Sequence, residues 1–181
     1  ATGARPRRLT CPGARRALDF RTYPDAAAIF SRTETAKSVA IIGGGLIGME
    51  LAAVLRGKGI AVSVIEMAPR PLGRAVPPRF AARLHARHLD EGVTFHLGQA
   101  IAEIAEDTVV LSDGTPVPAD IVVAAIGVQP DTALAEAAGL GVGNGILTDG
   151  YLLTSDPNIS ASGDCAAVAQ PGGGHVRFES W

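Results

Sequence analysis

Val39-Ala-Ile-Ile-Gly-Gly-Gly-Leu-Ile-Gly-Met-Glu50 is the stretch of this 181-residue chain that decides its fold. It holds the pattern G-x-G-x-x-G as Gly43, Gly45 and Gly48, directly after the apolar run Val39–Ile42. A run with helix-compatible composition follows the last glycine. A strand, a glycine-rich turn and a helix in this order are typical of the β-α-β unit that binds a dinucleotide. The stretch therefore predicts both a fold and a class of ligand.

Each glycine of the pattern is needed for a different physical reason. Gly43 lets the chain turn sharply out of the strand, Gly45 lets a pyrophosphate approach the backbone, and Gly48 lets the helix pack closely against the strand. We expect the helix to begin near Leu46. The free N–H groups of its first turn, including those of Leu46 and Ile47, then face the phosphates together with the positive end of the helix dipole.

The next predicted strand, Val62–Glu66, ends in an acid 18 positions after Gly48. A carboxylate at this place accepts hydrogen bonds from the adenosine ribose and repels a 2′-phosphate, so Glu66 favours NAD over NADP. Arg70 and Arg74 follow closely and weaken that preference. We include Arg74 among the candidate cofactor-binding residues.

Composition limits the size of the core and the kinds of partner that the chain can have. A hydrophobic content of 47% in 181 residues is enough for one good core, and a net charge of −2 gives no reason to expect a nucleic-acid partner. Basic residues are concentrated at the start of the chain, which is compatible with a phosphate-facing role or with a solvated basic edge. Six lie in the first 21 positions: Arg5, Arg7, Arg8, Arg15, Arg16 and Arg21.

The sequence predicts a cytoplasmic protein without a membrane partner. No apolar run reaches membrane-spanning length, and no apolar segment follows the first arginines as it would in a signal peptide. Cys11 and Cys165 are far apart and form no C-x-x-C pair, so we expect two ordinary thiols. His85 and His88 have no Cys or acid nearby in a metal-binding pattern, and we interpret them as a surface pair with no metal.

The predicted fold is α/β: a Rossmann-like parallel sheet with helices on both faces and an inserted three-stranded antiparallel meander. Asp113-Gly114 between apolar runs is a hairpin signal that favours the meander. Its predicted strands are Ala100–Ala105, Thr108–Leu111 and Pro116–Pro118. Further predicted strands are Val93–Leu97, Asp120–Ile126, Ile146–Leu153 and Asn158–Ala161, and further helices are Pro24–Phe30, Pro78–Leu89 and Asp131–Ala138.

Five motifs together resemble one family. They are Ala1-Thr-Gly3, Gly43–Glu50, Ala125-Ile-Gly-Val-Gln-Pro130, Ala161-Ser-Gly-Asp164 and Glu179-Ser-Trp181. In this order the set resembles the FAD-dependent pyridine nucleotide oxidoreductases. Within them it is most similar to the ferredoxin reductases of aromatic-ring dioxygenase and cytochrome P450 systems and to their rubredoxin and putidaredoxin relatives.

The resemblance implies hydride transfer from NADH to FAD and electron transfer to a ferredoxin-like or rubredoxin-like iron–sulfur protein. In this family the NAD domain is inserted between two halves of the FAD domain, and the family's first FAD motif is absent here. We therefore expect a fragment, with an FAD-domain stub and linker at 1–35, the NAD-binding domain at 36–150 and a second FAD-domain stub at 151–181. No side chain is expected to act as a catalytic acid or base, because the redox chemistry belongs to the cofactors.

For NAD, the resemblance places Glu50 beside the nicotinamide. A structural alternative is that Glu50 stabilises the helix N-terminus. Ile126 and Gly127 end a predicted buried strand, where ligands bind at the carboxyl edge of a parallel sheet; Gly127 also permits a turn.

For FAD, the resemblance implies contacts from Thr2, Gly3, Gly163 and Asp164, and it places Trp181 near the flavin. Asp164 has the alternative role of capping a following helix, and Trp181 that of simple packing. Two further functions stay open: a self-standing NAD-binding module without catalysis, and a fragment of a pyridine nucleotide-disulfide reductase.

Overall fold

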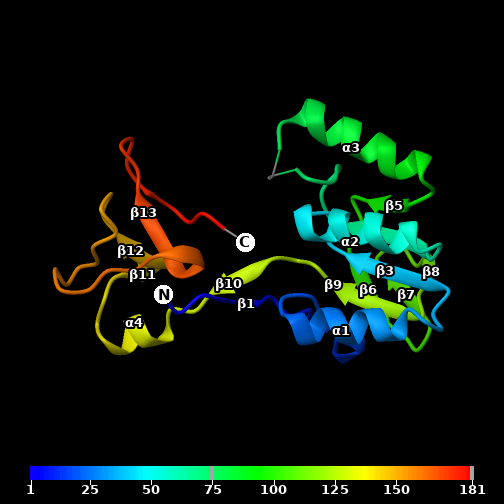
Figure 1. Cartoon of the computed structure of the whole chain (residues 1–181), viewed down its shortest axis with the longest axis horizontal. Helices are drawn as coiled ribbons and strands as arrows, with labels where there is room; N and C mark the ends of the chain where they lie inside the picture. Colours follow the sequence, from blue (N-terminus) through cyan, green and yellow to red (C-terminus); the bar gives the residue numbers. More distant parts are fainter. Residues whose placement is uncertain (74–75, 180–181) are drawn as a thin grey trace. The chain divides into compact units, whose positions relative to one another are not determined.

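The computed structural model describes residues 1–73 and 76–179 (Figure 1). The chain forms two compact units, one of Arg8–Gly127 and one that joins Ala1–Arg7 to Val128–Trp181. These units are defined by packing within the chain. The division expected from the sequence, at 35/36 and 150/151, separates NAD-binding from FAD-binding segments and stays a prediction. No helix among the described residues is both long and apolar enough to cross a membrane.

A five-stranded parallel sheet is the centre of the unit Arg8–Gly127, with the strand order β2-β9-β3-β4-β5. Its strands are β2 (Ala17–Asp19), β3 (Ser38–Ile42), β4 (Ala61–Glu66), β5 (Thr94–Leu97) and β9 (Ile121–Ala124). The Rossmann-like parallel sheet predicted from the sequence is confirmed. β3 and β9 are nearly continuous apolar runs because a central parallel strand is covered on both faces.

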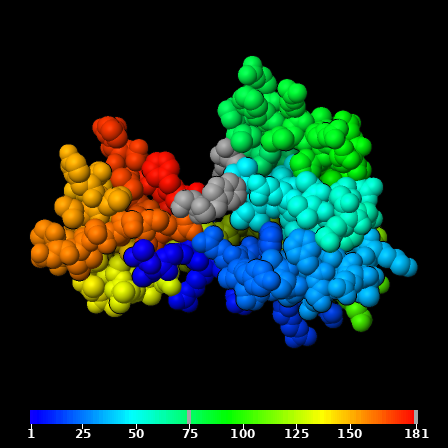
Figure 2. Space-filling view, in the orientation of Figure 1, coloured from blue at the N-terminus to red at the C-terminus, as the bar shows by residue number. Residues whose placement is uncertain are grey.

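Helices cover one face of this sheet. They are α1 (Tyr23–Arg32), α2 (Leu46–Gly57) and α3 (Pro78–Asp90). Ile29 of α1 and Leu51 and Leu55 of α2 pack on Val39 and Ile41 of β3. α3 joins α2 through a smaller apolar cluster, and their surfaces adjoin in cyan and green in Figure 2.

The antiparallel meander covers the other face. Its strands are β6 (Ile101–Ile104), β7 (Thr108–Leu111) and β8 (Pro116–Pro118), within one residue of the prediction. Its inner side chains, among them Val109 and Leu111, pack against Ala40, Ile42 and Ile65 of the parallel sheet.

The prediction of helices on both faces is therefore wrong for the described residues of this unit. The strands β3, β4 and β5 follow one another in one direction across the sheet, and right-handed crossovers place α2 and α3 on a single face. The chain then returns from β5 to β9 in the opposite direction. A right-handed return lies on the opposite face, and the meander occupies that face in place of a helix.

The segment before β3 is part of this unit. α1 begins with a reciprocal capping box, in which Asp25 N–H donates to Thr22 and the Asp25 carboxylate accepts from Thr22 N–H. A Cβ on Gly13 would lie 1.9 Å from the carbonyl oxygen of Ile104, so only glycine permits this close approach to β6. Residues 8–19 thus contribute an edge strand and a contact with the meander.

The second unit has shorter elements. β1 (Ala4–Pro6) pairs with β10 (Val128–Pro130), and a four-stranded sheet has the order β11-β12-β13-β14. Its strands are β11 (Val142–Gly143), β12 (Gly145–Thr148), β13 (Ala166–Ala169) and β14 (His175–Val176), with α4 at Ala133–Ala137 and a 3-10 turn, η2, at Gly163–Cys165.

Two strand predictions fail in this unit. The strand expected at Ile146–Leu153 ends at Thr148, because the Asp149 carboxylate accepts hydrogen bonds from Tyr151 N and Leu153 N and folds the chain into a turn. The strand expected at Asn158–Ala161 is reduced to a single bridge between Leu153 and Ser160.

Candidate functional site

The glycine loop begins where β3 ends. Gly43 N–H donates to Ile65 O at 2.8 Å, and Gly43 has a φ of 110°, in the left-handed region. A Cβ at this position would lie 2.3 Å from the carbonyl oxygen of Ala125, at the end of β9. Gly43 is therefore required both by its backbone conformation and by the closeness of two adjacent strand ends.

The other two glycines of the pattern face different surroundings. A Cβ on Gly48 would lie 2.1 Å from Gly43 O, so this glycine lets α2 pack against the loop. A Cβ on Gly45 would meet no heavy atom within 4 Å, and Gly45 is exposed. The loop is thus closely packed on its inner side and open at Gly45.

α2 begins at Leu46, as predicted, with Gly45 as its N-cap and no side chain capping it. The N–H groups of a first helical turn have no intrahelical partner, and they carry the positive end of the dipole. Leu46 and Ile47 are partly exposed in this turn. An acid stabilises a helix most when it lies in the first turn. Glu50 is exposed and is the fifth helical residue, so it lies beyond that turn.

Glu66 lies at the carboxyl end of β4 and turns back to the loop. One carboxylate oxygen accepts from Gly44 N at 2.7 Å, and the other accepts from Ala68 N at 2.8 Å. A carboxylate offers about four acceptor positions, so two remain for a ligand. Glu66 consequently orders the glycine loop in addition to offering acceptors at the predicted ribose position.

Sequence reasoning missed a contact on the other side of the same glycine. Leu72 N–H donates to Gly44 O at 2.7 Å, from the connection between β4 and α3. Leu72 is buried and has a φ of 57°. No sequence signal marks this position, because a leucine with a positive φ contradicts the usual preference.

Ile126 and Gly127 follow β9 and adjoin the loop through the strand ends. Ala125 N–H donates to Ile42 O at 2.7 Å, which fixes the end of β9 beside the end of β3. Gly127 is exposed, has a φ of 88° and has open space where a Cβ would lie. β3 connects to β4 on one side while β9 lies on the other, so the loop stands at the switch point where open α/β sheets bind ligands.

The candidate FAD residues come together in the second unit. The Thr2 and Gly3 segment contacts Cys165, next to Gly163 and Asp164. Burial raises the pKa of the Cys165 thiol, but hydrogen bonds from Thr2 and Gly3 outweigh burial and leave that pKa below its usual value. Two motifs from distant parts of the sequence therefore meet in one place.

Asp164 is buried, with 7% of its surface exposed, in η2. η2 is followed directly by β13, so the alternative role of Asp164 as a helix cap is wrong. Arg177 donates from its guanidinium to the backbone carbonyl of Asp164 at 3.3 Å and forms an ion pair with Glu179 at 2.6 Å. The segment before residue 180 is thereby joined to the turn that holds Asp164.

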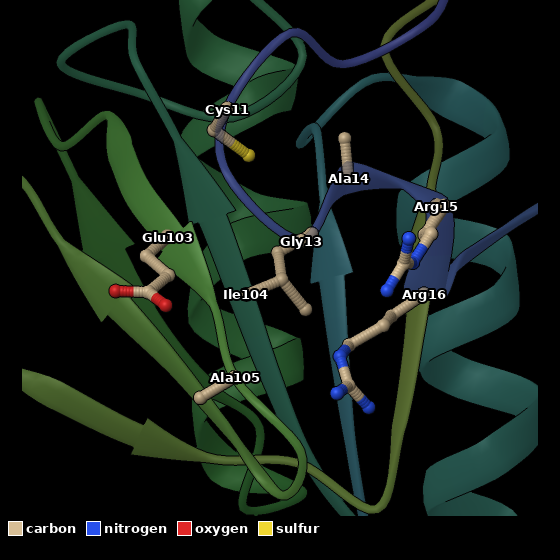
Figure 3. Close-up of a pocket in the computed structure, with 8 residues that line it drawn as sticks. All are labelled: Cys11, Gly13, Ala14, Arg15, Arg16, Glu103, Ile104 and Ala105. Atoms are coloured by element: carbon tan, nitrogen blue, oxygen red, sulfur yellow. The ribbon is translucent and has the colours of Figure 1, made fainter.

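Two candidate residues, Arg74 and Trp181, lie outside the described residues. The hollow in Figure 3 is a separate feature, and no glycine-loop residue contributes to it. Its lining residues are Cys11, Gly13, Ala14, Arg15, Arg16, Glu103, Ile104 and Ala105. Gly13 and Ile104 meet at its wall, and none of its lining residues was predicted to bind a cofactor.

The two histidines of α3 are not the surface pair that the sequence predicted. The His85 ring packs edge-on against Phe95 with 4.4 Å between centroids, and burial, followed by the nearby charge of His88, lowers the pKa of His85. His88 places Nε2 3.0 Å from Met49 O of α2. Both rings are half-buried because α3 packs onto α2 and β5 along this side.

Comparison with known proteins agrees with this arrangement. The chain matches the pyridine nucleotide-disulphide oxidoreductase family over residues 1–181. The chain belongs to this family. It is 42% identical to rhodocoxin reductase of Rhodococcus erythropolis, covering 99% of this chain and 44% of the relative. It is 41% identical to the ferredoxin–NAD(+) reductase component of the p-cumate 2,3-dioxygenase system of Pseudomonas putida, covering 100% of this chain and 46% of the relative.

A solved structure extends the likeness to three dimensions. The ferredoxin reductase for the CYP199A2 system from Rhodopseudomonas palustris is 44% identical, with a TM-score of 0.95, over 99% of this chain and 46% of that one. The resemblance to ferredoxin reductases inferred from the five motifs is confirmed. The chain spans less than half the length of these relatives.

Proposed function

We propose that this chain is the NADH-binding part of an FAD-dependent ferredoxin reductase, which passes electrons from NADH through FAD to an iron–sulfur protein. The observation that supports it most is the glycine loop, open at Gly45, with Glu66 beside it at the carboxyl edge of a parallel sheet. The names of the relatives add the reaction and the kind of acceptor.

The proposed roles follow the geometry of the loop. The pyrophosphate binds at Gly45, Leu46 and Ile47, because free N–H groups and the positive end of α2 favour an anion there. The ribose hydroxyls donate to the remaining acceptors of Glu66, which gives a preference for NAD over NADP. Space for the pyrophosphate exists, since even a Cβ on Gly45 would touch nothing.

The nicotinamide half is assigned to the adjoining strand ends. Glu50 is exposed on α2, and Gly127 is exposed with open space around its Cα. We place the nicotinamide near Glu50, Ile126 and Gly127, where these residues orient the ring. NADH supplies the hydride when bound, and the protein fixes the position of the nicotinamide ring and excludes other orientations of it.

In the complete protein, Thr2, Gly3, Gly163 and Asp164 belong to the FAD site. The meeting of these two segments in one unit supports that role. The isolated chain is proposed to lack reductase activity, because the matched relatives are more than twice as long. The acceptor is a ferredoxin-like or rubredoxin-like protein, and the cytoplasmic location stays a prediction from the sequence.

NADH titration of the purified chain, followed by nucleotide fluorescence, tests the proposal. Gly45→Ala places a methyl group in the open part of the loop and is expected to weaken NADH binding at least tenfold without loss of folding. Gly57→Ala at the other end of α2 also meets no atom within 4 Å and is the matched control, with unchanged affinity. Equal affinity in the two variants would contradict the assigned site.

A visible absorption spectrum separates the reductase from a self-standing NAD-binding module. A colourless chain that binds NADH supports the module for the isolated chain, with FAD bound only by the complete protein. Flavin bands near ~450 nm together with NADH oxidation would show that these residues rebuild an FAD site alone. A chain that binds no NADH would overturn the proposed function.

A further inference from the structure

The peptide between Gly44 and Gly45 is held from one side by a residue that no motif includes. Leu72 N–H donates to the Gly44 carbonyl at 2.7 Å, while the Glu66 carboxylate accepts from Gly44 N–H at 2.7 Å. Both polar groups of Gly44 are therefore bonded to residues outside the loop. Gly44 itself cannot rotate without breaking one of these bonds.

Leu72 is anchored for this contact. It is buried, with 3% of its surface exposed, and it packs with Met49 of α2 and Ala81 of α3 in a small apolar cluster. Its φ of 57° lies in a region that non-glycine residues rarely adopt. The surrounding packing holds the backbone in this conformation, and the conformation aims the N–H at Gly44.

The bond also fixes the direction of the N–H group of the same peptide. The chain has no cis peptide bonds among its described residues, and in a trans peptide the C=O and N–H point in opposite directions. With Gly44 C=O directed at Leu72, Gly45 N–H is directed away from Leu72. Within the described chain, Gly45 N–H has no hydrogen-bond acceptor, and the space beside Gly45 is open.

We propose that Leu72 is a positioning residue for the pyrophosphate of the dinucleotide. Its N–H fixes the Gly44–Gly45 peptide so that Gly45 N–H is already aimed at the bound phosphate. Packing against α2 and α3 keeps the donor in place before the ligand arrives. This inference rests on the proposed NADH-binding function and assigns a residue to it that the glycine pattern lacks.

Replacing the Leu72 amide with an ester tests this role without changing the side chain. The α-hydroxy analogue of leucine at position 72 removes the N–H donor and keeps the buried side chain. The same replacement at Leu111, whose N–H donates to Thr115 O at 2.9 Å in the meander, is the matched control. Circular dichroism confirms that each protein is folded before titration.

We expect the Leu72 ester to bind NADH and ADP-ribose about fivefold more weakly, which corresponds to a net hydrogen bond of about 1 kcal/mol. Adenosine, which has no phosphate, is expected to bind equally to both proteins and to the wild type. A uniform loss for all three ligands would indicate a structural role alone and overturn the proposal. Unchanged ADP-ribose affinity would overturn it as well.

An NMR measurement on the wild-type chain needs no variant. ADP-ribose is expected to shift the Gly45 amide proton downfield, while adenosine leaves that proton in place. An unmoved Gly45 signal with ADP-ribose bound would overturn the positioning role while leaving the proposed function intact. Failure of the wild type to bind NADH or ADP-ribose would overturn both.

Discussion

The two candidate cofactor regions of this protein are built in opposite ways. In the unit Arg8–Gly127, the residues proposed for NAD lie mainly in one β-α-β stretch from Gly43 to Glu66, where the Glu66 carboxylate accepts a hydrogen bond from Gly44 N–H. In the other unit, Thr2 and Gly3 contact Cys165, which is next to Gly163 and Asp164 but far from Thr2 along the chain. A local pattern is enough to find the first region, whereas the second becomes visible only when the chain is folded.

Glycine has a different structural role in each region, and replacing it by alanine in the NAD region is expected to have the largest effect. Gly48→Ala would place a Cβ 2.1 Å from the backbone oxygen of Gly43, which no side-chain movement relieves. We expect a loss of about 3 kcal/mol in unfolding free energy, typical of an overpacked site, and a large loss of NADH affinity. Urea unfolding measures the first effect, with Gly57→Ala as control. A stable Gly48→Ala chain with normal NADH binding would mean that the loop is looser than its contacts indicate.

The corresponding change in the second unit is Gly145→Ala. Gly145 has a φ of 129°, and its Cβ would lie 2.9 Å from Cys165 O and 3.2 Å from the Ala167 Cβ. Backbone strain of this kind costs about 2 kcal/mol. Hydrogen exchange is expected to accelerate in β12 and β13, while NADH affinity stays unchanged. Gly150→Ala, in open space, is the control, and a fall in NADH affinity in Gly145→Ala would contradict the assignment of the NAD site to the other unit alone.

A smaller effect is expected from Asp120, which fixes the start of β3. Hydrogen bonds from Lys37 N–H and Ser38 N–H lower the pKa of Asp120 from its usual 3.8. Because the pKa of Asp120 is lower in the folded chain than in the unfolded chain, its carboxylate stabilises the fold at pH values above 3.8. This contribution is lost as the pH falls below 3.8. Because Asp120 is exposed, we expect only about 1 kcal/mol for Asp120→Asn at pH 7. Thermal unfolding at several pH values checks this, since wild type and variant should converge in acid; a constant difference would assign the effect to something other than the charge.

The smallest effect is expected at the Arg5–Asp131 ion pair of the second unit. The atoms are 2.7 Å apart, but the Arg5 side chain is 76% exposed. Exposed ion pairs contribute about 0–1 kcal/mol and are screened by salt. Arg5→Met should lower stability by less than about 0.5 kcal/mol, and the difference should vanish at high ionic strength. A larger effect that persists in salt would show that Arg5 contributes by packing, and not by its charge.

Regular structure was predictable wherever local chemistry determines it. Pro78 starts α3, and Asp113-Gly114 forms the turn between β7 and β8, as expected from turn preferences. The glycine loop and Glu66 were also found at their expected places. β2 was missed, because its three residues have no periodicity and exist as a strand only through pairing with β9.

The remaining errors have tertiary or side-chain causes. The face that each connection covers depends on the order of strands in the sheet, which residue patterns do not reveal. The strand expected to continue to Leu153 was interrupted at Asp149-Gly150, a turn signal that was available in the sequence. The positive φ of Leu72 had no such signal, since it is imposed by the packing of α2 and α3.

The position of β9 between β2 and β3 has a consequence for synthesis of the protein on the ribosome. β2 and β3 are translated before β9, and β9, the strand that joins them, ends only at Ala124. Until that strand has left the exit tunnel, β3 presents a bare apolar edge to which another nascent chain could pair. We expect folding of this unit to wait until β9 has been translated, and chaperones that shield strand edges to act within that interval.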